Sequence, residues 1–225
     1  MVIICQQQTT SRNEKIDVSI FNIKNLQCIR RDNILFQGLN FDLEQGGLLQ
    51  IDGVNGSGKS SLLQMCVGLI QASEGSINWN GVNIKESRYQ FQSDMTYFGH
   101  SNGVKAELTA RENMKVMHAL SGDKSDIDYS SILKQIGLAG LEDVLLSRMS
   151  AGQKRRVGLS RIFMTQSKLW LLDEPFNALD KNGKKIIEQL IVKHCTAGGM
   201  VIFATHQTME IDGYPLQHIH LGNET

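Results

Sequence analysis

The sequence predicts an α/β protein with an antiparallel β subdomain and a helical insert. Three observations support this fold class. Short apolar runs typical of buried strands occur in both halves of the chain. One of them leads directly into a glycine-rich loop of the phosphate-binding type, and a helical pattern follows that loop. Between the halves, from about residue 93 to 155, the pattern is largely helical, which indicates an insert in the α/β core.

The first part of the chain carries the signals of the β subdomain. Apolar and polar residues alternate over residues 19–23, which predicts a strand, and residues 34–36 and 39–43 predict two more. Paired glycines predict a turn over residues 44–47. Residues 48–52 then form a largely apolar run, which is typical of a buried strand.

The remaining elements alternate between helix and strand. Apolar residues repeat at intervals of three and four from residue 59 to about 70, which predicts a helix. Residues 75–81 indicate a short strand that ends in a turn. The other expected helices cover residues 109–122, 129–137, 153–165 and 181–194, the other expected strands cover residues 169–172 and 200–204, and two short apolar stretches lie near residues 214–221.

Composition limits the class of protein. The chain has 225 residues, of which 41% are hydrophobic and 20% charged, as in an ordinary globular protein. Basic and acidic residues balance at 23 each, so no nucleic-acid partner is expected. No apolar run approaches the roughly 20 residues that span a bilayer, and Val2–Cys5 is too short for the core of a signal peptide. A partner is therefore expected to supply any membrane-spanning part.

Two further expectations concern the chain ends and the metal-binding residue types. Residues 1–17 are polar and aperiodic, so we expect a flexible N-terminal extension there and a folded domain over residues 18–225. The cysteines are scattered without a CxxC pair, which favours reduced thiols over disulfides or a zinc site. His218 and His220 alternate on a predicted strand and share a face, which we interpret as a surface pair.

The loop from Gly53 to Ser60 has the complete spacing G-x-x-x-x-G-K-S. Its glycines let backbone N–H groups turn toward a phosphate, Lys59 can place its charge on the β and γ phosphates, and the Ser60 hydroxyl can ligate Mg²⁺. The strand before the loop and the helix after it argue against a chance match. The residues expected to bind the nucleotide are Gly53, Val54, Asn55, Gly56, Ser57, Gly58, Lys59, Ser60 and Ser61.

The apolar run 169–172 ends in two carboxylates, Asp173 and Glu174, directly before Pro175. An aspartate released at the end of a buried strand can hold Mg²⁺, usually through water. The glutamate beside it can orient or deprotonate an attacking water. The alternative is an ordinary acidic end of a strand, and the phosphate loop upstream favours the catalytic interpretation.

Small residues at the start of a predicted helix form a second candidate anion site, because backbone amides at a helix start attract anions. This site comprises Ser150, Ala151, Gly152 and Gln153. The phosphate loop already serves the chain's own nucleotide. The second site therefore predicts a nucleotide held between two copies of the chain. The basic residues Lys154–Arg156 that follow are interpreted as a solvated turn.

Together these motifs resemble the P-loop NTPase core of ABC type, the ATP-binding domain of ABC transporters, over about residues 19–221. The resemblance implies an ATPase that uses ATP and Mg²⁺ and closes as a head-to-tail pair of copies. Lys59 and Glu174 would take part in catalysis. His206, after the strand at 200–204, would sense the γ-phosphate and help to fix the transition state. Asp180, in Asn177–Asp180, would contact the second copy.

Two positions depart from that family. His100 stands where the family has a glutamine that links Mg²⁺ to the transmembrane partner, and it could reach the metal or a water. Arg30 stands where the family stacks an aromatic ring on adenine, and its guanidinium could stack on the base there through a cation–π interaction.

The segments Gly99–His100, Gly103–Lys105 and Leu108–Asn113 resemble more specifically the ATP-binding subunit of the cytochrome c maturation exporter, often described as a haem exporter. This resemblance implies that hydrolysis drives haem export or delivery. The chain would then lie on the cytoplasmic face of the inner membrane, bound to an integral membrane subunit that contacts residues 97–109.

Several alternatives remain open. The ATPase subunit of another ABC exporter would share every catalytic residue. A soluble ABC ATPase of the iron–sulfur assembly type would differ in having cytosolic partners. A nucleotide-binding regulator without turnover is disfavoured by the presence of Glu174 and His206.

Overall fold

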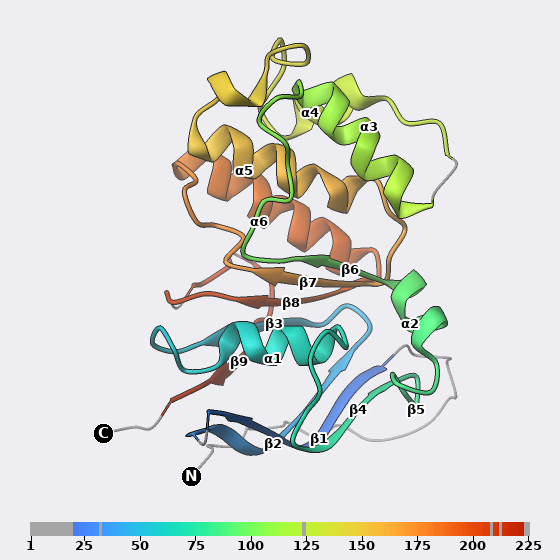
Figure 1. The fold of residues 1–225 in the computed structure, drawn as a ribbon, viewed down its shortest axis with the longest axis vertical. Helices are drawn as coiled ribbons and strands as arrows, with labels where there is room; N and C mark the ends of the chain where they lie inside the picture. The colour runs from blue at the N-terminus through green and yellow to red at the C-terminus, as the bar shows by residue number, and fades with distance from the viewer. Residues whose placement is uncertain (1–19, 32, 123–124, 208, 212, 223–225) are drawn as a thin grey trace.

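The computed structural model describes residues 20–31, 33–122, 125–207, 209–211 and 213–222. The expected N-terminal extension, residues 1–17, lies outside the described residues. The described part has the predicted α/β architecture, with two sheets in successive layers and a group of helices beyond them (Figure 1).

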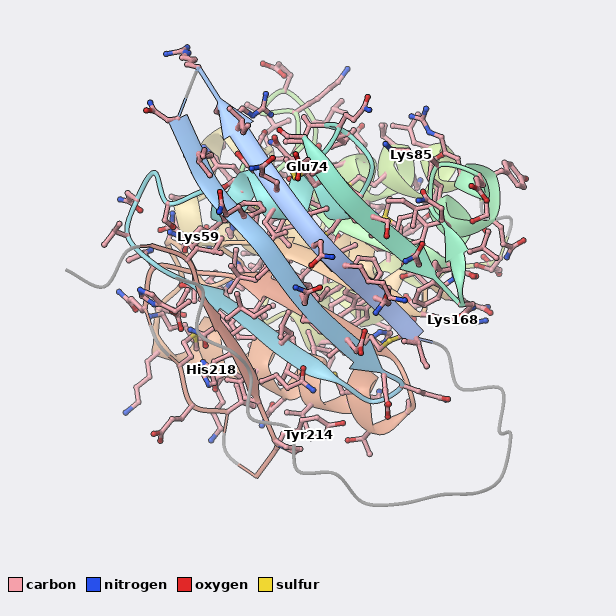
Figure 2. All side chains as sticks on the ribbon, turned by 90° about the horizontal axis from the view of Figure 1, so that it is seen from below. Lys59, Glu74, Lys85, Lys168, Tyr214 and His218 are labelled. Atoms are coloured by element: carbon pink, nitrogen blue, oxygen red, sulfur yellow. The ribbon has the colours of Figure 1, made fainter. Side chains whose placement is uncertain are left out.

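The first sheet is antiparallel and has the strand order β2-β1-β4-β5. Seen from below, its long strands run diagonally across the front of the molecule, with Glu74 at the start of β4 (Figure 2). Its strands are β1 (Ile20–Arg30), β2 (Asn33–Glu44), β4 (Glu74–Trp79) and β5 (Val82–Asn83).

One expected boundary in this sheet is wrong. The strands predicted at 34–36 and 39–43 form one strand, β2, which continues through Gly38 at a φ of 64°. Antiparallel pairing with β1 bridges the interruption, and the register between the two strands shifts along their length. Because of these bulges, both halves of β2 stay hydrogen-bonded to the same partner strand, β1. The apolar pattern of one strand gives no information about such pairing.

The second sheet is parallel and has the order β6-β7-β8-β3-β9. Every residue of β3, β7 and β8 is buried. Helices cover both faces of this sheet, α1 on one side and α6 on the other (Figure 1), which explains why these strands read as continuous apolar runs. The strands are β3 (Leu48–Asp52), β6 (Met95–Phe98), β7 (Leu169–Asp173), β8 (Met200–Ala204) and β9 (Gln217–His220).

Most helix boundaries follow capping signals. Thr109 and Glu112 form a capping box at the start of α3, and Gly122 ends that helix in the left-handed conformation. The helix expected over 59–70 ends earlier, because the chain turns at Gly68 with a φ of 73°. The helices are α1 (Lys59–Cys66), α2 (Arg88–Asp94), α3 (Ala110–Ser121), α4 (Tyr129–Gln135), α5 (Ala151–Leu159) and α6 (Lys181–Thr196), with 3₁₀ turns η1 (Leu146–Arg148) and η2 (Ser160–Phe163).

The helical layer has a core of its own, built by α3, α4 and α5 around Met114, Leu133 and Val157. Strand β6 falls inside the range of about 93–155 expected for the insert, yet it pairs with β7 in the central sheet. Only four residues long, β6 gives a weak sequence signal, and its partner β7 lies far along the chain.

Helix α2, which the sequence did not reveal, joins the two sheets. Phe91 is 1% exposed, stacks on Phe21 at a centroid distance of 6.2 Å and contacts Trp79 in a tilted arrangement at 6.0 Å. At the end of α2, Asp94 accepts a hydrogen bond from Trp79 Nε1 at 2.9 Å.

We therefore expect Phe91→Ala to lower the free energy of unfolding by about 3–5 kcal/mol, because it leaves a cavity in the core beside Phe21 and Trp79. Denaturant unfolding followed by circular dichroism measures this change. Tyr89→Ala on the same helix is the matched control, since Tyr89 is 88% exposed. Equal losses for the two variants would contradict this role of Phe91.

Candidate nucleotide-binding site

The phosphate loop lies between β3 and α1, as expected. Its backbone follows left-handed turns at the glycines, with φ values of 140° at Gly53, 87° at Gly56 and 104° at Gly58. A Cβ on Gly53 would lie 2.1 Å from the carbonyl oxygen of Leu221, directly after β9, so that only glycine fits. The loop is therefore held against the edge of the central sheet.

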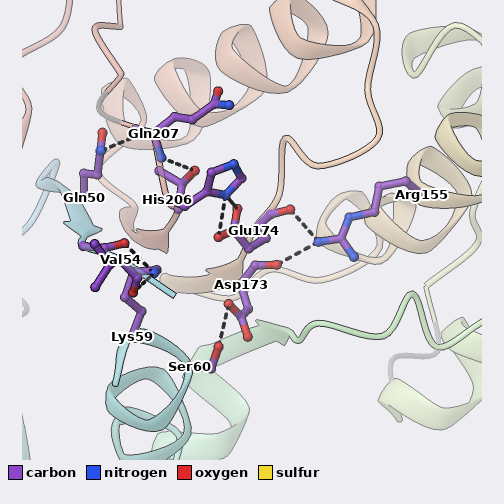
Figure 3. A network of polar contacts seen from close by, with 11 residues as sticks. Gln50, Val54, Lys59, Ser60, Arg155, Asp173, Glu174, His206 and Gln207 are labelled. Carbon is purple, nitrogen blue, oxygen red and sulfur yellow. Dashed lines mark hydrogen bonds and ion pairs between the residues drawn. The ribbon is translucent and has the colours of Figure 1, made fainter. Parts of the chain in front are cut away.

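Lys59 is buried within this loop. Its Nζ donates hydrogen bonds to the carbonyl oxygens of Gly53 at 2.7 Å and Val54 at 3.0 Å (Figure 3). The ammonium is thus fixed at the rim of a cavity of about 370 Å³. The cavity is lined by Leu35, Asn55, Gly56, Gly58, Lys59, Ser60, Ser61, His100 and Glu174.

Asp173 ends β7 next to this cavity and is 2% exposed. Burial raises the pKa of its carboxyl group, and a hydrogen bond donated by Ser60 Oγ to Asp173 Oδ1 at 3.2 Å opposes this effect. A buried carboxylate beside a hydroxyl is the oxygen donor set that a hard divalent cation prefers. Ser60 and Asp173 could therefore hold such a cation, and His100 lines the same cavity.

Glu174 has a backbone conformation that is rare for its residue type, with a φ of 51°. Its backbone N–H donates to the carbonyl oxygen of Ala204 at 2.9 Å, which ties the ends of β7 and β8 together. Its carboxylate oxygens lie 3.1 and 3.2 Å from Nδ1 of His206 (Figure 3). The two residues expected to act on the γ-phosphate are thus direct neighbours.

The second candidate anion site begins α5, and its residues satisfy one another. Ser150 Oγ accepts from the Gln153 backbone N–H at 3.2 Å, and Gln153 Oε1 accepts from the Ser150 N–H at 2.8 Å. A Cβ on Gly152 would lie 2.7 Å from the Ala178 carbonyl oxygen. We call the cavity of about 370 Å³ beside the phosphate loop the phosphate cavity, and its described lining includes none of Ser150, Ala151, Gly152 or Gln153.

Two other expected site residues lie outside the cavity lining that the structure describes. Asp180 is the N-cap of α6 and accepts from the Gly183 N–H at 2.7 Å. Arg30 pairs with Asn33 at the end of the antiparallel sheet, and from β2 it is Leu35 that reaches the cavity. The proposed contact of Arg30 with adenine remains a prediction.

Arg155 corrects the interpretation of Lys154–Arg156 as a solvated turn. The side chain of Arg155 is 5% exposed, and its guanidinium bonds to the backbone of both Asp173 and Glu174. Arg156 is half-buried and donates to the Ile136 and Gly137 carbonyl oxygens at 3.3 and 3.4 Å. The spacing of Arg155 from Gly158 and Leu159, on the buried face of α5, was the available signal.

The expected surface pair on β9 has a carboxylate partner. Both His218 and His220 contact Asp52, the last residue of β3 before the phosphate loop. Within the described parts of the chain, no group of three or more His, Cys, Asp or Glu side chains forms a metal-holding cluster.

We expect Gly53→Ala to abolish nucleotide binding and to destabilise the fold by more than the about 1–2 kcal/mol that a left-handed alanine costs. Gly81→Ala is the matched control: Gly81 has a φ of 79°, and a Cβ there meets nothing within 4 Å. Fluorescent-nucleotide titration and thermal unfolding provide the two readouts. Normal nucleotide affinity in Gly53→Ala would rule out the steric argument.

The chain is similar to known proteins over most of its length. Residues 36–177 match the ABC transporter family. The chain is 44% identical over 203 residues to the cytochrome c biogenesis ATP-binding export protein CcmA of Aliivibrio fischeri, covering 90% of this chain and 100% of that protein. It is 45% identical over 197 residues to the protein of the same name from Nitrosospira multiformis, covering 87% of this chain and 96% of that protein.

Solved structures share the fold. An ATP-binding protein of a putative ABC transporter from Pyrococcus furiosus superposes with a TM-score of 0.76 at 21% identity, covering 90% of this chain and 97% of that one. The ATP-binding subunit of an ABC transporter superposes with a TM-score of 0.77 at 21% identity, covering 90% and 87%. In the described part of the chain, none of the helices combines the length and apolar character needed to cross a membrane.

The family match covers more than half of the chain, and the two relatives match nearly all of it. The chain therefore belongs to the ABC transporter family, as an ATP-binding subunit that hydrolyses ATP.

Proposed function

We propose that this chain is the ATP-hydrolysing subunit of a membrane ABC complex for cytochrome c biogenesis, and that hydrolysis drives haem export or delivery. The observation that carries this proposal is the identity of 44–45% to two proteins named as cytochrome c biogenesis ATP-binding export proteins, across nearly their whole length. The segments around His100 and Leu108–Asn113 that resemble this subfamily support the same assignment.

Each site residue then has a role in hydrolysis. Lys59 and the loop N–H groups bind the phosphates, and Ser60 with Asp173 would hold Mg²⁺, which neutralises phosphate charge when bound. Glu174 takes a proton from the attacking water. The oxygen of that water bonds to the γ-phosphorus as the bond from the γ-phosphorus to the β–γ bridging oxygen breaks. His206 Nδ1 faces Glu174, which leaves Nε2 for the γ-phosphate.

The proposed unit is a pair of copies, each contributing one ABC ATPase domain over residues 18–225. Support comes from the position of the second anion site: Ser150 and Gly152 begin α5 away from the described lining of the chain's own phosphate cavity. Closed head to tail, one copy would place these residues on the other's γ-phosphate, and Asp180 would lie at the contact.

The membrane subunit is proposed to bind near residues 97–109 and to hold the chain on the cytoplasmic face of the inner membrane. A cavity of about 840 Å³ opens beside this segment, between β6, α3 and η2. Its lining includes Met95, Gly103 and Met117, and Leu120 at its rim is 82% exposed. The cavity, rather than this single side chain, supports the placement, because isolated exposed apolar residues are common on protein surfaces.

Substitution Glu174→Gln is expected to lower turnover at least about 100-fold while ATP still binds, because the amide cannot accept the proton from water. Phosphate release and nucleotide titration measure the two properties. Glu86→Gln, at an exposed glutamate of the β subdomain, is the control. Unchanged turnover in Glu174→Gln would remove Glu174 from the role of base.

The complex itself is tested by purifying the tagged chain from detergent-solubilised membranes and identifying the proteins that accompany it. Recovery of an integral membrane subunit together with cytochrome c maturation factors is expected. Recovery of the transmembrane subunit of another exporter, or only of soluble iron–sulfur assembly proteins, would leave the ATPase intact and overturn the haem-delivery assignment.

A further inference from the structure

We propose that Arg155 is a positioning residue for hydrolysis: its guanidinium fixes the backbone that carries Glu174, and so aims the carboxylate at the phosphate cavity. This inference rests on the proposed role of Glu174 as base. It assigns a task to a side chain that none of the motifs explains.

The contacts are direct and well formed. Arg155 Nη2 donates to the Asp173 carbonyl oxygen at 2.7 Å and to the Glu174 carbonyl oxygen at 2.6 Å (Figure 3). Hydrogen bonds from an ionised donor are short and stronger than neutral ones. One nitrogen therefore holds two successive peptide groups, on either side of the Glu174 Cα atom.

The backbone at this point needs such support. Glu174 is held at a φ of 51°, and a residue with a side chain keeps a left-handed conformation only where its surroundings enforce it. If Glu174 relaxed to an ordinary φ, its carboxylate would leave His206 and the cavity that it lines. The fixed Glu174 carbonyl is thus a condition for the direction of its side chain.

A second guanidinium nitrogen reaches a different segment. Arg155 Nη1 donates to the His100 carbonyl oxygen at 3.0 Å and to Asn102 Oδ1 at 2.9 Å. The guanidinium also lies over the Phe98 ring, 4.2 Å from its centroid. Arg155 therefore joins three segments: α5 with its anion site, the loop after β6, and the end of β7.

The chemistry of these contacts requires arginine. Two nitrogens in a planar fork reach four acceptors on two segments, whereas lysine carries its donors on a single nitrogen. Burial lowers the pKa of Arg155 to about 10, which leaves it charged at neutral pH. A displacement of α5 would move this fork and with it the carbonyl of Glu174.

The test compares Arg155→Lys with Arg156→Lys in the full chain, purified with its membrane subunit. Arg156 is the matched control because it is the next residue on the same helix. It donates to the carbonyl oxygens of Ile136 and Gly137, directly after α4, and not to the backbone of Glu174. Steady-state kinetics should show kcat reduced at least about tenfold in Arg155→Lys with the KM for ATP within about twofold, since a small misplacement affects the chemical step most. Arg156→Lys should keep kcat within about twofold.

A second measurement separates positioning from general damage. In the Glu174→Gln background, Arg155→Lys should leave the residual rate unchanged, because residues that act through one another are not additive. If Arg155→Lys fails to fold, Arg155→Met takes its place, because its neutral side chain requires no buried charge. Arg155→Met should show the same loss of kcat.

The outcomes are distinct. If Arg155→Lys keeps the wild-type kcat while Glu174→Gln is inactive, the proposed role of Arg155 is wrong and that of Glu174 stands. Equal losses in Arg155→Lys and Arg156→Lys, or a further fall in the Glu174→Gln background, would also overturn it. Full turnover in Glu174→Gln would instead show that the proposed role of Glu174 is wrong.

Discussion

The parallel pairing of β3, β7 and β8 is the constraint on which the site depends. Because the three strands run in the same direction, their carboxyl ends meet at one edge of the sheet. The phosphate loop leaves β3 there, the carboxylates leave β7, and His206 follows β8. Groups more than 100 residues apart in sequence, such as Ser60 and Asp173, thus come within hydrogen-bonding distance.

Backbone carbonyl groups balance the buried charges of this edge. The Lys59 ammonium and the Arg155 guanidinium are both nearly inaccessible to water, and each donates to two or more main-chain oxygens. Hydrogen bonds from its donors to such oxygens lower the cost of burying a cation. The same carbonyls belong to the loop and to the strand end that carry the proposed catalytic groups, so that these hydrogen bonds also fix the geometry of the site.

The helical layer reaches the site through a few defined connections. Helix α5 begins with the second anion site and, one turn later, sends Arg155 to the end of β7. The loop after β6, near the proposed membrane contact, joins the same guanidinium through His100 and Asn102. A change in the orientation of this layer on partner or nucleotide binding therefore has a short route to Glu174.

The sequence by itself determined the local features. The glycine spacing of the phosphate loop, the acidic end of the apolar run at 169–172 and the capping box at Thr109 depend on neighbouring residues. For this reason the fold class, and the position of the phosphate loop between a strand and a helix, were predictable from the sequence. Only the tertiary structure decided the single long β2, strand β6 in the central sheet, helix α2 and the burial of Arg155. Each of these is stabilised by partners far along the chain, and spacing within a short window carries no information about such contacts.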